Sequence, residues 1–147
     1  MKLKRYFLSV LMIGICAISA HAGAGKEAIL AARSETGRIQ LLVKIWDVDG
    51  PVSKAQLVID KDSTDLSAQY DVYTLVDLPN HILTLYFQEK GKPAGTDGAK
   101  TLKAWAIPSS FVKTVSSSEY NWRFKIKLSG DLVKEITTLS GTFEWNP

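Results

Sequence analysis

Apolar and basic residues alternate strictly in the stretch Trp122-Arg123-Phe124-Lys125-Ile126-Lys127-Leu128. Because successive side chains of a β-strand point to opposite faces, this alternation predicts a strand with one face on a core and a basic face toward water. The residues that follow, Ser129-Gly130-Asp131, are typical of a turn. The stretch therefore predicts a β-protein in which exposed cations lie along one strand.

The same two-residue period recurs along the chain and predicts further short strands separated by turn residues. Turns are indicated by Asp47-Val48-Asp49-Gly50-Pro51, by Pro79-Asn80-His81 and by the glycine-rich loop of residues 89–98. This spacing predicts an antiparallel β-sandwich of about seven to eight strands, with a small closed β-barrel as the alternative. The further predicted strands are residues 39–46, 55–59, 70–78, 82–88, 101–107, 132–138 (weaker) and 141–145.

Residues 26–33 permit two interpretations. Alanine and leucine favour a helix, but eight residues are marginal for a helix that has to stand alone in water. The same segment can pair as an edge strand across the turn Ser34-Glu35-Thr36-Gly37. Both interpretations remain open from the sequence.

The first residues of the chain have the order of a secretory signal peptide. Three basic residues within Met1–Arg5 precede an apolar run over residues 6–20, which ends at Ala20-His21-Ala22. The apolar run is shorter than the roughly 20 residues of a membrane-spanning helix. The sequence therefore predicts a cleaved leader of residues 1–22, a single domain over residues 23–147 that does not span the membrane, and a periplasmic or secreted location.

Removal of the leader would leave a nearly neutral domain. All fifteen acidic residues follow Ala22, whereas three of the eighteen basic residues precede it, so fifteen of each remain. A nucleic-acid-binding domain normally carries a net basic surface, so this balance argues against nucleic acid as a partner. The single cysteine, Cys16, lies in the leader, and the predicted domain must be stabilised by its core without disulfides.

The remaining sequence offers little catalytic or metal-binding chemistry. His81 is the only histidine after the leader, and its neighbours Pro79-Asn80 indicate a turn residue rather than a catalytic base. The acidic run Asp60-Lys61-Asp62-Ser63-Thr64-Asp65 lacks the glycine at position six of an EF-hand loop. We therefore predict a protein that is not an enzyme and that has no metal site and no cofactor.

A resemblance to a known family covers residues 38–91. It is carried by Asp49-Gly50-Pro51-Val52-Ser53-Lys54-Ala55-Gln56-Leu57-Val58-Ile59, then by Tyr73-Thr74-Leu75-Val76-Asp77-Leu78-Pro79, and then by Leu83-Thr84-Leu85. This order of motifs resembles the carboxypeptidase regulatory-like, transthyretin-like β-sandwich family. The resemblance implies a sandwich topology and a non-catalytic structural or binding module.

The tryptophans and the basic strand face supply the predicted binding site. Trp122 and Trp145 lie on the apolar phase of their strands and are predicted to join the core. Trp46 and Trp105 lie on the opposite phase, so they either face solvent or cover a second small cluster beneath the loop of residues 89–100. Exposed aromatic rings beside cations are typical of surfaces that bind another protein. We predict a protein partner in the cell envelope or outside the cell, and the alternatives are a glycan, an apolar small molecule or, third, a hydrolase function. The predicted binding residues are Trp46, Trp105, Arg123, Lys125 and Lys127.

Overall fold

The computed structural model describes residues 27–48, 50–93 and 95–146, so the predicted signal peptide lies outside the described residues. Nearly all of the regular structure is β. The strands are β1 (Glu27–Arg33), β2 (Ile39–Trp46), β3 (Val52–Ile59), β4 (Asp62–Asp65), β5 (Tyr70–Asp77), β6 (Ile82–Glu89), β7 (Thr101–Ala106), β8 (Val112–Lys113), β9 (Trp122–Gly130) and β10 (Thr137–Asn146). The described helical segments are α2 (Leu66–Gln69) and the single 3-10 turn η1 (Pro108–Ser110).

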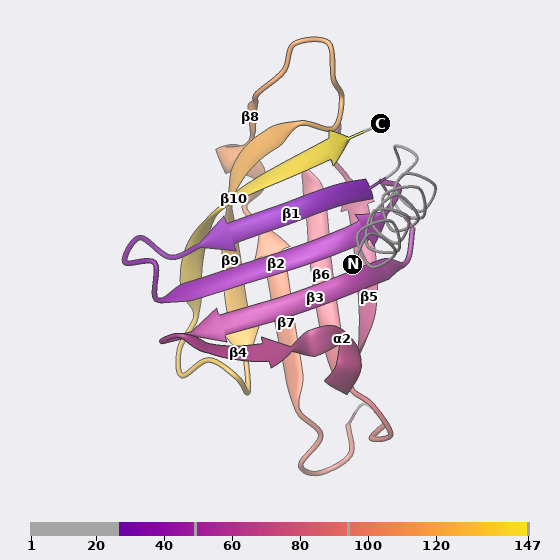
Figure 1. The fold of residues 1–147 in the computed structure, drawn as a ribbon, viewed down its shortest axis with the longest axis vertical. Coiled ribbons are helices and arrows are strands. Elements are labelled where there is room, and N and C mark those ends of the chain that lie inside the picture. Colours follow the sequence, from indigo (N-terminus) through magenta and orange to yellow (C-terminus); the bar gives the residue numbers. More distant parts are fainter. Residues whose placement is uncertain (1–26, 49, 94, 147) are drawn as a thin grey trace, which may run out of the picture.

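The ten strands form one antiparallel sheet in the order β4-β3-β2-β1-β10-β9-β7-β6-β5, with β8 beside β9. The sheet curls into a half-barrel, in which β10 and β1–β4 lie in front of β9, β7, β6 and β5 and cross them steeply (Figure 1). The predicted all-β class is confirmed. The prediction of seven to eight strands is wrong, since β4 and β8 are too short to show periodicity, and the finer choice between sandwich and closed barrel is not confirmed.

The segment at the start of the described chain is a strand, not a helix. β1 pairs with β2 on one side and with β10 on the other, so it is a central strand rather than an edge strand. Leu30 faces Val43 and Phe143 across these two pairings, and all three side chains are fully buried. Pairing along both edges and burial of one face override the helix propensity of alanine and leucine, which is a weak local preference.

The two strands predicted at residues 132–138 and 141–145 are a single strand, which begins later than the first of them. Residues 132–136, part of the weaker predicted strand, form a turn, and β10 then runs unbroken from Thr137 to Asn146. Leu139 and Phe143 point into the core with Gly141 between them. A Cβ atom at Gly141 would lie 2.9 Å from Cδ1 of Ile126, so the glycine leaves room for that core side chain.

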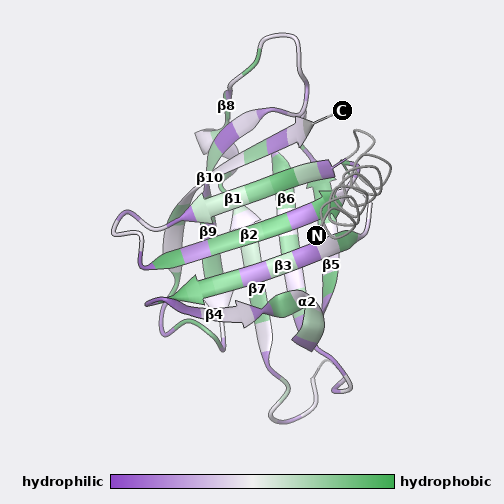
Figure 2. Ribbon diagram, viewed as in Figure 1, coloured by the Kyte–Doolittle hydropathy of each residue, from purple (hydrophilic) through white to green (hydrophobic). Residues whose placement is uncertain are grey.

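The buried residues lie on the strand faces that the alternation predicted to face the core. In β9, Phe124, Ile126 and Leu128 are buried, and Leu41, Val43 and Ile45 of β2 are buried in the same way. Figure 2 shows hydrophilic residues interrupting the hydrophobic ones along the front strands, as expected for one buried and one wet face. Trp122 and Trp145, which were predicted to join the core, are partly buried and pack against it.

The long loop between β6 and β7 is closed at its base by Glu89. The backbone N–H of Glu89 donates to the carbonyl of Lys100, and the N–H of Lys100 donates to Oε2 of Glu89, each at 3.0 Å. Lys92 forms an ion pair with the same carboxylate at 3.2 Å. These donors lower the pKa of Glu89 below its ordinary value of 4.5, the backbone hydrogen bond contributing most and desolvation opposing it.

A lowered carboxyl pKa makes folding stability depend on pH in the acid range. The contribution of Glu89 to the free energy of unfolding is fully present at pH values above 4.5, the ordinary pKa of a glutamate. It is lost as the pH falls through the lower pKa of Glu89 in the folded state. We expect Glu89→Gln to make the decline in unfolding free energy between about pH 5 and pH 3 shallower than in the wild type, measured by urea unfolding. Glu35→Gln is the matched control, because Glu35 has no ion pair in the described part of the chain, and an equally shallow decline in that control would contradict the assignment.

Candidate functional site

The basic residues of β9 form a ridge on the outer surface of the sheet. Arg123 and Lys125 are exposed and Lys127 is partly exposed, because the residues between them point into the core. We call Arg123, Lys125 and Lys127 the basic ridge. It lies in the middle of the sheet, since β10 pairs with one side of β9 and β7 and β8 pair with the other.

On one side of the basic ridge the outer surface is aromatic. Trp105 of β7 lies opposite Lys127, and the Nζ atom of Lys103 is 5.2 Å from the centroid of the Trp105 ring. Tyr86 of β6 lies opposite Lys103, and Tyr73 of β5 lies opposite Tyr86 with ring centroids 6.4 Å apart. Together with Leu75, which is two residues along β5 from Tyr73, these residues make up the aromatic face: Tyr73, Leu75, Tyr86 and Trp105.

The most exposed part of the aromatic face was not predicted. Tyr73 and Leu75 are each 61% exposed, whereas Tyr86 and Trp105 are partly buried. Both phases of β5 carry large apolar residues, so periodicity does not tell which phase faces water. Because β5 has only one buried face, one of its two apolar phases has to be exposed, and the structure shows that it is the phase of Tyr73 and Leu75.

Four of the five predicted binding residues share this outer surface, and the fifth does not. Trp105, Arg123, Lys125 and Lys127 lie on neighbouring strands β7 and β9. Trp46 is 43% exposed, which decides between the two alternatives for this residue, but it ends β2 opposite Glu27 of β1. It therefore lies in the other half of the curled sheet (Figure 1), and the structure does not bring it together with Trp105.

On the other side of the basic ridge, the outer surface is hollowed into a groove of about 780 Å³. We call this the basic groove. It crosses β9, β10, β1, β2 and β3, and η1 and β8 contribute residues at one side. The side chains on the outer phase of these elements that line it are Ala31, Arg33, Gln40, Leu42, Gln56, Val58, Ser110, Val112, Arg123, Lys125, Ser140 and Thr142.

The groove exists because its floor carries small side chains and its wall is a locally irregular segment. Ala31, Ser140 and Thr142 occupy the middle of the floor on β1 and β10. At the wall, the hydroxyl of Ser110 accepts a hydrogen bond from the backbone N–H of Lys125 at 2.8 Å and donates to the carbonyl of Ile107 at 2.6 Å. The Ser110 hydroxyl therefore accepts a β9 backbone N–H at the point where η1 separates β7 from β8, the two strands that pair with this side of β9.

The groove carries positive charge that no carboxylate neutralises within the described residues. In the described part of the chain, the ion pairs join Arg38 to Asp60, Lys44 to Glu27 and Lys92 to Glu89. None of them includes Arg33, Arg123 or Lys125, and no described lining residue of the groove is acidic. The three cations are therefore available to an anion from outside the chain.

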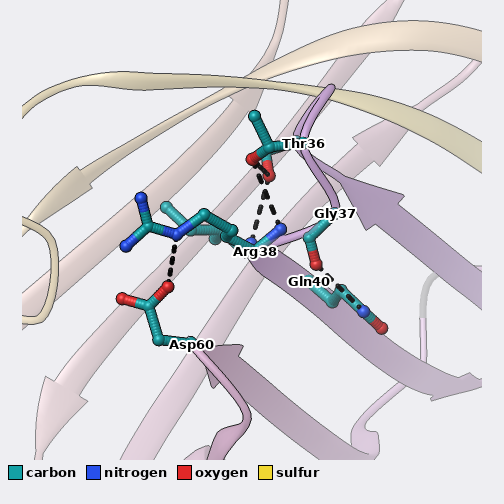
Figure 3. Close-up of polar contacts among 7 residues, drawn as sticks. Thr36, Gly37, Arg38, Gln40 and Asp60 are labelled. Atoms are coloured by element: carbon teal, nitrogen blue, oxygen red, sulfur yellow. Dashed lines mark hydrogen bonds and ion pairs between the residues drawn. The ribbon is translucent and has the colours of Figure 1, made fainter.

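Arg38 shows the contrast, because it lies near the groove and is neutralised. Its Nε atom donates to Oδ1 of Asp60 across the start of β2, as Figure 3 shows. That hydrogen bond is the main cause that lowers the pKa of Asp60, and the positive charge of Arg38 adds to it against desolvation. In the same turn the amide of Gln40 donates to the carbonyl of Gly37 at 3.2 Å, which orients this groove residue.

The other polar residues singled out in the sequence have structural roles. His81 lies in the β5–β6 turn with a φ of 58°, and its ring stacks on Phe111 at 4.8 Å, as expected for a turn residue. Asp65 caps α2 by accepting from the N–H of Ala68. Within the described ranges, no group of three or more His, Cys, Asp or Glu side chains is placed to hold a metal ion, and no helix is long and apolar enough to cross a membrane.

Comparison of the chain with protein-family models, with curated proteins and with solved structures finds no match.

Proposed function

We propose that this chain is an exported, non-enzymatic domain that binds another protein, in the cell envelope or outside the cell, through the aromatic face. The observation that carries the proposal is the exposure of Tyr73 and Leu75, each 61% accessible, beside Tyr86 and Trp105 on one outer surface. Exposure of a group of large apolar side chains to water is unfavourable, whereas aromatic side chains stabilise protein interfaces when they are buried there.

The position of the aromatic face adds a second means of attachment. β5 is the last strand of the sheet on its side, and its eight residues are paired only with β6 among the described strands. An edge strand offers backbone N–H and carbonyl groups to which an extended segment of a partner can pair. A partner strand added to β5 would place its own side chains beside Tyr73 and Leu75.

The resemblance of residues 38–91 to the transthyretin-like family agrees with this proposal, since it implies a binding module without catalysis. The alternative function, binding of a small ligand or a glycan, has its own structural support in the basic groove, which is separate from the aromatic face.

Substitution of the exposed apolar pair tests the proposal. We expect Tyr73→Ser/Leu75→Ser to weaken partner binding by at least about tenfold, because loss of interface anchors typically costs 2 kcal/mol or more. Proteins captured from envelope extract or culture medium by the immobilised wild type are identified by mass spectrometry. The dissociation constant of each is then measured by surface plasmon resonance against wild type and variant.

The matched control is Ile136→Ser, because Ile136 is 62% exposed and lies in the β9–β10 turn, away from the aromatic face. Both variants change exposed side chains, so both are expected to fold like the wild type by circular dichroism. A captured protein that binds the aromatic-face variant as tightly as the control would show that this surface is not the interface.

A further inference from the structure

We infer that the basic groove is a second, independent binding site, and that its ligand is an acidic saccharide, one whose rings carry carboxylate or sulfate groups. This inference does not depend on a protein partner for the aromatic face. It rests on the charge, the hydrogen-bonding groups and the shape of the groove.

The cations are spaced to hold an anionic ring. Lys125 and Arg33 lie in one cross-strand row on either side of Ser140, with roughly 10 Å between their backbones. Arg123 lies two residues from Lys125 on the same face of β9, roughly 7 Å along the strand. Because Ser140 is small, long side chains from both sides can extend over it. Arginine pairs with carboxylate or sulfate through two parallel hydrogen bonds, which favours a ligand with such groups.

Neutral polar side chains continue the site beyond the cations. In the row that contains Arg123, Thr142 is followed by Ala31, Leu42 and Gln56 on successive strands. Amide and hydroxyl groups both donate and accept hydrogen bonds, as sugar hydroxyls require. Leu42, together with Val58 and Val112, offers apolar surface for the faces of sugar rings.

The groove suits a saccharide better than an acidic peptide. Its floor is the face of a paired sheet, where the backbone N–H and carbonyl groups are already used between strands. A bound peptide would find no main-chain partners there, whereas peptides that bind sheets normally pair with an edge. The volume of about 780 Å³ lies within the range of pockets that hold small ligands.

Calorimetric titration with four probes of matched length tests the inference. The probes are oligogalacturonate, a heparin-derived oligosaccharide, a neutral maltooligosaccharide and oligoglutamate. We expect binding of the carboxylated or the sulfated saccharide, weakened by added salt, and none of the neutral one. The two acidic probes distinguish which anionic group the site takes.

Variants locate the site within the groove. Arg33→Gln and Arg123→Gln are each expected to weaken binding roughly tenfold, because each removes a charge-assisted hydrogen-bonding group. Ser140→Tyr keeps all three cations but fills the floor, and is expected to abolish binding. Lys134→Gln removes the same charge from an exposed position outside the groove and is expected to change affinity less than about twofold.

Several outcomes overturn the inference: no acidic saccharide binds, the neutral saccharide binds equally well, oligoglutamate binds more tightly than the saccharides, or Lys134→Gln costs as much as Arg33→Gln. Circular dichroism of each variant shows whether the fold is kept. The aromatic-face variant Tyr73→Ser/Leu75→Ser is expected to bind the saccharide normally, so failure of one proposal is distinguishable from failure of the other.

Discussion

Phe143→Ala is expected to lower the free energy of unfolding by about 3 to 5 kcal/mol, the usual cost of truncating a buried phenylalanine. Phe143 is fully buried in β10 and lies between Leu30 of β1 and Trp122 of β9. Its removal leaves a cavity where the front half of the sheet curls into the back half. Because small domains are stable by only about 5 to 15 kcal/mol, this single change removes a large part of the total. Urea unfolding followed by tryptophan fluorescence measures the loss.

Phe143→Leu is the control for this prediction. It keeps an apolar side chain of similar size, so we expect a cost below about 1.5 kcal/mol. A loss under about 1 kcal/mol for Phe143→Ala would contradict the packing described here, since it would mean that the ring contributes little to the core.

Gly130→Ala is expected to destabilise the protein by at least about 3 kcal/mol through the backbone rather than through the core. Gly130 has a φ of 145°, in a region used almost only by glycine, where strain costs of order 1 to 3 kcal/mol. A Cβ atom there would lie 2.3 Å from the carbonyl oxygen of Thr101 and 2.7 Å from Cα of Leu102, so the pairing of β7 with β9 would have to open.

Gly98→Ala separates the two causes of the stability loss at Gly130, which are backbone strain and the clash of the added Cβ atom. Gly98 also has a positive φ, 80°, but a Cβ atom there would have no heavy atom within 4 Å. We expect a cost of about 1 to 2 kcal/mol at Gly98, from backbone strain alone. Equal losses at Gly98 and Gly130 in urea unfolding would show that the approach of Thr101 to Gly130 is not the main cause.

Gly130 and Phe143 also matter for the proposed binding surfaces. Gly130 pairs with Leu102, and this register places Trp105 opposite Lys127 three residues further along. Phe143 belongs to β10, whose outward residues Ser140 and Thr142 form the floor of the basic groove. A one-residue shift in either pairing would turn outward side chains inward, because successive residues of a strand face opposite sides. Stable pairing in the middle of the sheet is therefore a condition for both proposals.

The sequence by itself determined where most strands lie and which face of each is buried. The alternation of Phe124, Ile126 and Leu128 with Arg123 and Lys125 is local, and burial of one face follows from it directly. For the same reason the outward position of the β9 cations was predicted correctly, whereas the period left open whether Trp46 faces solvent. The two-residue period did not predict β4 and β8, because they are too short to show alternation. It also did not decide whether residues 26–33 form a helix or a strand.

Tertiary structure alone decided which strands are neighbours, and with them the composition of each surface. β1 pairs with β10 at the other end of the described chain, and this contact makes a strand of a segment whose local preferences are balanced. The same contact brings Arg33 to Ser140 and Lys125, and the pairing of β5 with β6 brings Tyr73 to Tyr86, while Trp46 is carried away from Trp105. The physical reason is that side-chain periodicity depends on a few consecutive residues, whereas pairing depends on burial summed over segments far apart in the chain.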